Sequence, residues 1–133
     1  MTAMKTNGNA VTRVELAFNA LKLLGLTCEE RGLVFGRKET KDNRHLNGLK
    51  QELVKSCSID ASDRLDWLVD IGTGVAVLCG SDHDKMKAWM EVKHKDLENM
   101  LREGLTPKQL LLTGHLHHVA KLHAYVGGLV GAK

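Results

Sequence analysis

Apolar residues recur at steps of three and four along most of this chain, which is the spacing of one face of an α-helix. The pattern is clear over residues 11–26, and strand-type runs of Val, Ile, Thr and aromatic residues are almost absent. We predict a first helix over this range that ends near Gly25, because glycine accepts the positive φ that often follows a helix. The apolar face of this helix is formed by Val14, Phe18, Leu21 and Leu24.

A second helix is predicted over residues 28–35. Thr27 and Glu30 have the three-residue spacing of a capping box, in which each side chain bonds the backbone N–H of the other at the start of a helix. Gly36 follows the last apolar residue and closes the helix. The chain therefore begins with two helices joined by a tight turn.

The middle of the chain predicts a short helix and then a long one. Leu46 and Leu49, followed by Leu53 and Val54, give weak helical spacing that predicts a short third helix and a further segment. A long helix capped by Asp60 or Ser62 should then extend to Leu78, with Trp67 as its large anchor. Because it carries Gly72 and Gly74, which are poor helix formers, we expect close packing by neighbouring helices at these positions.

Three shorter stretches and a final helix follow. Ser81 or Asp82 should cap a helix carrying Met86, Trp89 and Met90, Gly104 should end the next one, and Thr106 with Pro107 should begin another. The last helix is predicted over residues 115–129, with an end loosened by glycines and a partly mobile C-terminus. Its apolar positions are Leu116, Val119, Leu122, Val126 and Leu129, and the glycines are Gly127, Gly128 and Gly131.

These elements predict an all-α protein. We divide the chain into a flexible N-terminal tail over residues 1–10, a helical region over 11–57 and a second helical region over 58–133, with the boundary between Cys57 and Asp60. The formal charge of +3 at pH 7 names no partner by itself. Three widely spaced cysteines suit a reducing cytoplasm, and no apolar run approaches the roughly 20 residues of a membrane span, so we expect a soluble cytoplasmic protein without a membrane partner.

The stretch from Ser81 to the end resembles the C-terminal module of the MbcA/ParS/Xre family of antitoxins, the partners of RES-domain toxins. The resemblance is carried by three motifs in order: "DKMKAWM" with Trp89, "DLENMLREGLTPKQLL" with its proline followed by two apolar residues, and "HVAKLHAYVGGLV" with its late glycines. The N-terminal "ALKLLGLTCEERGLVFG" resembles the first two helices of the Xre-type helix-turn-helix that many members place before that module. The combined resemblance, over both regions, covers about nine-tenths of the chain.

The resemblance implies an antitoxin of a type II toxin-antitoxin system. Such a protein would bind a toxin that acts on NAD, block its active-site cleft and repress its own operon, and we expect a homodimer. Residues carried over as toxin-binding are Trp89, His118, Tyr125, Val126, Gly127, Gly128, Leu129, Val130 and Lys133. We expect deletion of residues 125–133 to abolish neutralisation while the fold survives, because that end should carry little core.

The alternative function is that of a helix-turn-helix transcriptional regulator without a toxin. The most basic stretch of the chain is residues 37–50, where a recognition helix would lie, and Lys and Arg there could neutralise DNA phosphates. The competing interpretation is a solvated face, because the stretch contains no aromatic residue to stack on bases. The candidate DNA-binding residues are Arg37, Lys38, Lys41, Asn43 and Arg44.

Enzymatic and metal chemistry are disfavoured by the spacing of the reactive residues. His115, His117, His118 and His123 lie close together, but their stretch contains no HExxH motif and no carboxylate to complete a metal site. Cys28, Cys57 or Cys79 paired with a histidine would make a hydrolase, for which the sequence gives little support. We therefore expect a binding protein without catalytic residues, metal or cofactor.

Overall fold

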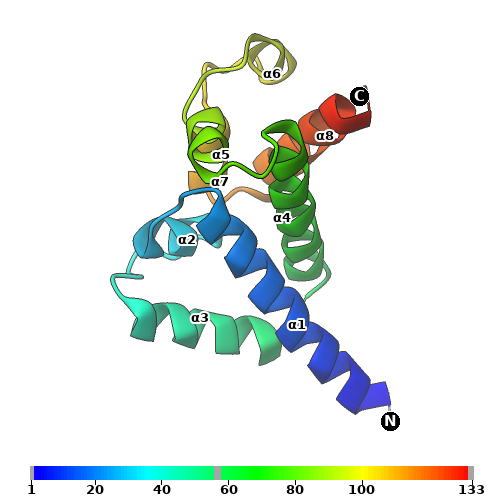
Figure 1. The fold of residues 1–133 in the computed structure, drawn as a ribbon. Helices are drawn as coiled ribbons and strands as arrows, with labels where there is room; N and C mark the ends of the chain where they lie inside the picture. Colours follow the sequence, from blue (N-terminus) through cyan, green and yellow to red (C-terminus); the bar gives the residue numbers. More distant parts are fainter. Residues whose placement is uncertain (1, 56–57, 132–133) are drawn as a thin grey trace.

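The computed structural model describes residues 2–55 and 58–131, with side chains described from Ala10 onward. Within these residues every regular element is an α-helix, which confirms the predicted all-α fold. Figure 1 shows the helices in order along the chain. Their bounds are α1 Thr2–Leu23, α2 Cys28–Val34, α3 Asn43–Lys55, α4 Ile59–Leu78, α5 His83–Met90, α6 Lys95–Leu101, α7 Pro107–Leu112 and α8 Leu116–Gly131.

The long helix α4 lies between α1 and α8 (Figure 1). Two glycines set these contacts, because a Cβ added at Gly72 would lie 2.7 Å from the Cβ of Ala20 on α1, and one at Gly74 would lie 2.3 Å from Cγ1 of Val126 on α8. Both distances are too short for real carbon atoms in contact. The predicted close packing at Gly72 and Gly74 is therefore confirmed, with a different neighbour for each glycine.

The helix α8 runs beside α4 in the same direction. The imidazole Nε2 of His123 lies 2.9 Å from a carboxylate oxygen of Asp70 near the middle of both helices, and Gly74 meets Val126 one turn further along each. The two C-terminal ends therefore lie side by side, and they reach the surface together.

One core joins the two regions that the sequence divided between Cys57 and Asp60. Buried side chains from both sides of that division form a single cluster, including Phe18, Val34, Leu65, Leu111 and Leu122. Cys57 itself lies outside the described residues. The burial of large apolar side chains from distant parts of the chain is what holds the helices together, because each such side chain contributes on the order of 1.5–3 kcal/mol.

A polar contact also joins these regions. The half-buried guanidinium of Arg64 on α4 donates hydrogen bonds to the carbonyl oxygens of Val34 and Gly114, at 2.6 and 2.8 Å. Gly114 has a φ of +73° and sits against the end of α2, where a Cβ would lie 2.9 Å from the carbonyl oxygen of Leu33. The turn between α7 and α8 is therefore fixed to α2 and α4 at once.

Several predicted helix ends are confirmed. Thr27 and Glu30 form both hydrogen bonds of the capping box of α2. Pro107 is the first residue of α7 and directly follows the N-cap residue Thr106. Asp82 caps α5, as one of the two residues expected there. The predicted cap of α4 was wrong, because Ser58 accepts the hydrogen bond from the N–H of Ala61 and the helix begins before Asp60.

Other helix bounds also differ from the prediction. Residues 2–10, expected as a tail, belong to α1, and α3 is one continuous helix over the stretch expected as two segments. The helix α6 ends at Leu101 with Arg102 in the left-handed conformation, before Gly104. The helix α8 continues through its three glycines to Gly131, because α4 packs beside it and compensates for their low helix propensity. No helix of the described ranges combines the length and the apolarity needed to cross a membrane.

Candidate functional site

The segment of residues 37–44, here called the basic segment, contains the five side chains predicted to bind DNA. Only Asn43 and Arg44 lie on a helix, in the first turn of α3, whereas Arg37, Lys38 and Lys41 lie in the loop before it. The loop over residues 35–42 is longer than the turn of about three or four residues in a helix-turn-helix. The stretch of residues 37–50 that was expected to hold a recognition helix is therefore helical only from Asn43 onward.

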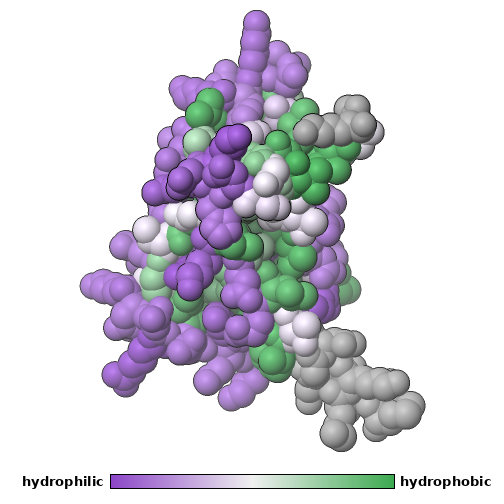
Figure 2. Space-filling model, in the orientation of Figure 1, coloured by the Kyte–Doolittle hydropathy of each residue, from purple (hydrophilic) through white to green (hydrophobic). Residues whose placement is uncertain are grey.

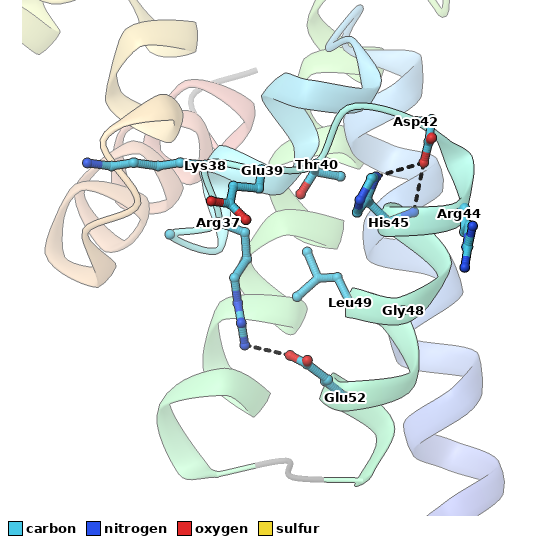
Figure 3. Close-up of a pocket in the computed structure, with 11 residues that line it drawn as sticks. Arg37, Lys38, Glu39, Thr40, Asp42, Arg44, His45, Gly48, Leu49 and Glu52 are labelled. Atoms are coloured by element: carbon cyan, nitrogen blue, oxygen red, sulfur yellow. Dashed lines mark hydrogen bonds and ion pairs between the residues drawn. The ribbon is translucent and has the colours of Figure 1, made fainter.

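Local contacts hold the basic segment in place (Figure 3). The guanidinium of Arg37 pairs with the carboxylate of Glu52 on α3 at 2.6 Å, and Thr40 is buried against Gly32 on α2. Asp42 accepts hydrogen bonds from the backbone N–H of His45 at 3.0 Å and faces the His45 ring at 2.8 Å. The His45 N–H in particular keeps the pKa of the Asp42 carboxyl below its usual value.

The remaining cations of the basic segment are open to solvent. Lys38, Lys41 and Arg44 are exposed, and no ion pair engages them within the described part of the chain. Lys38 and Arg44 line a hollow of about 870 Å³ between the loop and α3, together with Glu39, Asp42 and Glu52. The surface is therefore of mixed charge, with a few unpaired cations that can contact an anionic partner.

A second candidate surface lies where α4 and α8 reach the surface together. A groove of about 400 Å³ runs between the two helices, and we call it the α4/α8 groove. Figure 2 shows apolar residues gathered at this end of the molecule. The groove is lined by Asp70, Thr73, Gly74 and Val77 of α4 and by His123, Val126, Gly127, Val130 and Gly131 of α8.

The groove is open because its α8 side carries glycines. A Cβ added at Gly127 or Gly131 would meet no atom within 4 Å, and Val77 beside them is 51 % exposed. Gly128 is equally unobstructed but does not line the groove. A small apolar side chain or a helix of another molecule can therefore reach the backbone of α8 at Gly127 and Gly131.

The structure divides the residues predicted to bind a toxin into two groups. Gly127 and Gly128 are exposed, and Tyr125, Leu129 and Val130 are half-buried, whereas His118 and Val126 are buried. Val126 packs on Gly74 and is only 2 % exposed although it borders the groove, and His118 faces the interior, so both of these predicted contact residues are buried in this conformation. Lys133 lies outside the described residues.

Trp89 belongs to an aromatic cluster that the sequence did not predict. Its indole ring lies 4.3 Å from the His94 ring and 6.3 Å from the Tyr125 ring, measured between centroids. A ring nitrogen of His94 lies 2.9 Å from the carbonyl oxygen of Trp89, which fixes the chain between α5 and α6. Burial raises the pKa of the Tyr125 phenol, and the carboxylate of Asp96 raises it further.

The α4 residues of the groove were missed at the sequence level. Asp70, Thr73, Gly74 and Val77 are spaced by three or four residues and therefore share one face of α4. The sequence shows this spacing, but the apolar residues on the other sides of α4 led to the prediction that the helix is buried on all sides. His123, considered as a metal ligand, instead pairs with Asp70 at the edge of the groove.

Within residues 2–55 and 58–131, no group of three or more His, Cys, Asp or Glu side chains is arranged so that it could hold a metal ion. Cys28 and Cys79 are half-buried, and Cys57 lies outside the described residues. The two surfaces described above are thus suited to contact with another macromolecule through charge or through apolar packing. Comparisons of the chain with protein-family models, with curated proteins and with solved structures found no match.

Proposed function

We propose that this chain is an antitoxin that binds a RES-domain toxin and blocks the site at which the toxin acts on NAD. The resemblance of residues 81–131 to the toxin-binding module of the MbcA/ParS/Xre family supports this function. The fold agrees with it, because the stretch forms four successive helices, α5 to α8, with Pro107 at the start of the third. A protein of this type needs no catalytic group, since it acts by occupying a cleft.

The observation that carries the proposal is the α4/α8 groove next to the end of the chain. Apolar surface that is exposed to water is unfavourable, and a contiguous apolar patch on a protein surface commonly marks the place where a partner binds. Val77, Gly127 and Gly131 provide such surface on two rigid, parallel helices. We place the toxin contact in this groove, with the rest of an interface of about 800 Å² per partner spread over the adjacent faces of α5 and α8.

A leucine at Gly127 tests this placement. A Cβ at Gly127 would meet no atom within 4 Å, so a leucine there should occupy the groove and exclude a partner while leaving the fold intact. Gly128→Leu is the matched control: the resemblance counts Gly128 with the toxin-binding residues, but it does not line the groove in which we place the contact, and the chemical change is the same. In a growth assay with the co-expressed toxin, Gly127→Leu should fail to protect cells and Gly128→Leu should protect them.

The result against the proposal is equal protection by both variants. The partner for this assay is a RES-domain toxin encoded in the adjacent reading frame, whose presence the proposal also predicts. Deletion of residues 125–133 is a poor test, contrary to the expectation from sequence, because it removes the buried Val126 from the contact with α4. A loss of neutralisation by that truncated chain would reflect unfolding as well as lost contact.

A second function, binding of operator DNA, is favoured by the exposed cations of the basic segment. Lys38, Lys41 and Arg44 are exposed and have no ion-pair partners in the described ranges. Changing all three to Ala should weaken DNA association for all sequences and reduce its dependence on salt concentration. Unchanged affinity in a titration at two salt concentrations would contradict DNA contact by this segment.

The homodimer expected from the sequence is also part of the proposal. Leu16 and Leu23 support it, since they are seven residues apart on the outer side of α1 and are 49 % and 46 % exposed. Light scattering should give the mass of a dimer for the unaltered chain and of a monomer for Leu16→Glu combined with Leu23→Glu. A monomer before substitution would contradict this part of the proposal.

A further inference from the structure

Three histidines are packed together where α8 begins. The ring centroids of His117 and His118 are 4.2 Å apart, those of His115 and His118 are 5.5 Å apart, and those of His115 and His117 are 5.7 Å apart. His115 and His117 are exposed, whereas His118 is only 8 % exposed. The buried ring of His118 therefore lies against two other imidazole rings at the start of α8.

The surroundings of His118 favour its neutral form. Its Nδ1 lies 2.8 Å from the hydroxyl oxygen of Thr113, and its Nε2 lies 3.4 Å from a carboxylate oxygen of Glu103. Burial keeps the pKa of His118 below its usual value, and the charges that His117 and His115 can carry lower it further. Glu103 acts in the opposite direction, but its carboxylate is half exposed to solvent and is therefore screened.

The backbone at this place adds to the same effect. The first turn of a helix carries a partial positive charge from its free N–H groups, and α8 has no acidic residue in that turn to offset it. The guanidinium of Arg64, a permanent cation, donates to the carbonyl oxygen of Gly114, directly before His115. Of the charged groups that contact the cluster, Glu103 alone among the described residues is negative.

We propose that the start of α8 is an acid-sensitive joint, in which protonation of the buried His118 opens the α7–α8 turn. The hydrogen bonds at risk are those from the N–H groups of His118 and Val119 to the carbonyl oxygen of His115, at 3.1 and 3.3 Å. Opening the turn would also release Gly114 from α2 and Arg64. Acid would thereby loosen the attachment of α8 to the N-terminal helices, independently of any partner that the protein binds.

The direction of the pH effect follows from the histidine environment. A histidine that takes up protons less readily in the folded form than in the open form stabilises the folded form most above its ordinary pKa of about 6.5. That stabilisation declines as pH falls from about 6.5 toward the lower pKa of the folded form. The joint should therefore be closed at about pH 7.5 and weakened at about pH 5.5.

Hydrogen exchange at two pH values tests the joint on the full chain. After correction for intrinsic exchange rates, protection of the Val119 amide should fall about tenfold or more between pH 7.5 and pH 5.5, because each proton taken up changes the equilibrium by up to tenfold per pH unit. The Met86 amide, which bonds to the Asp82 carbonyl in the first turn of α5, is the internal reference and should change less. Equal changes at Val119 and Met86 would overturn the proposal.

Variants separate the histidine cluster from a general response to acid. His118→Gln removes the buried titratable ring and should remove most of the pH-dependent loss at Val119, whereas His115→Gln combined with His117→Gln, at two exposed side chains, should reduce it only in part because the burial of His118 remains. His83→Gln, at an exposed histidine on α5, is the matched control and should keep that loss. An unchanged loss in both the His118→Gln chain and the double variant would overturn the proposal.

Discussion

The two ends of α8 are built in opposite ways. At its start, Gly114 is pressed against α2, Arg64 bonds the preceding carbonyl oxygen and His118 is buried. At its end, Gly127 and Gly131 face open space beside the exposed Val77 of α4. The helix α8 therefore connects an anchored turn at its start with an apolar surface at its C-terminal end.

This difference separates stability from contact along a single element. Side chains at the start of α8 satisfy buried backbone groups, so changes there should cost folding free energy. Glycines at the end contribute no side-chain packing, so changes there should alter recognition without unfolding the chain. Val126 packs on Gly74 between the two ends, and it marks the boundary between the anchored part and the open part of α8.

The largest effect is expected where α4 and α8 touch between the two ends. Gly74→Val would place a branched side chain where even a single Cβ lies 2.3 Å from Val126, so the helices must separate. We expect a loss of about 3 kcal/mol in the free energy of unfolding, measured with urea. Adding Val126→Ala should recover part of that loss, and a loss below about 1 kcal/mol for Gly74→Val alone would contradict this packing.

A smaller loss is expected at the anchored end. Arg64→Met keeps much of the apolar length of the side chain but leaves the carbonyl oxygens of Val34 and Gly114 without this donor. We expect a loss of about 2 kcal/mol in the free energy of unfolding, since a buried acceptor left without its partner costs about 1–3 kcal/mol. Arg13, whose guanidinium pairs with the exposed Asp66, offers a control, and Arg13→Met should cost less.

At the open end the sign of the stability change should reverse. Gly127→Leu and Gly128→Leu each replace a poor helix former by a good one without a clash, so each should raise the free energy of unfolding by up to about 1 kcal/mol. Thermal unfolding of both variants measures this gain. A destabilised Gly127→Leu would show that the groove is closed in solution, and it would remove that variant as a test of toxin contact.

The smallest effect concerns Glu103 beside the histidine cluster. Its carboxylate favours the protonated form of His118, so Glu103→Gln should lower the pKa of His118 further. Stability above about pH 7 should therefore stay unchanged, while the loss on going to about pH 5.5 should become larger than in the unaltered chain. Urea unfolding at the two pH values measures this difference, and a smaller loss in Glu103→Gln would contradict the sign.

Much of this fold follows from local patterns in the sequence. Capping boxes at Thr27 and Thr106 act over three residues, and apolar spacing acts over a few turns, so both are visible without knowing which helices meet. Gly72 and Gly74 also indicated close packing correctly, because a glycine inside a long helix lowers its stability and is expected where a neighbouring helix leaves no room for a side chain. The all-α class and most helix positions rest on these short-range effects.

The site was less predictable because it depends on contacts between distant residues. Arg64 reaches Val34 and Gly114, which are separated from it by 30 and 50 residues, and no local pattern shows such a bond. His118 and Val126 were placed on the contact surface, yet helix packing turns both inward. The sequence predicts a recognition helix within residues 37–50, whereas residues 37–42 lie in a loop that the burial of Thr40 against Gly32 holds in place.

The central claim is that the open end of α8, beside α4, is where a RES-domain toxin binds. Hydrogen exchange of the purified chain with and without that toxin tests it most directly. We expect toxin binding to add hydrogen-exchange protection in residues 73–77 and 127–131, and to add none in α3. Protection confined to α3 and the basic segment, with the α4/α8 groove unchanged, would contradict it.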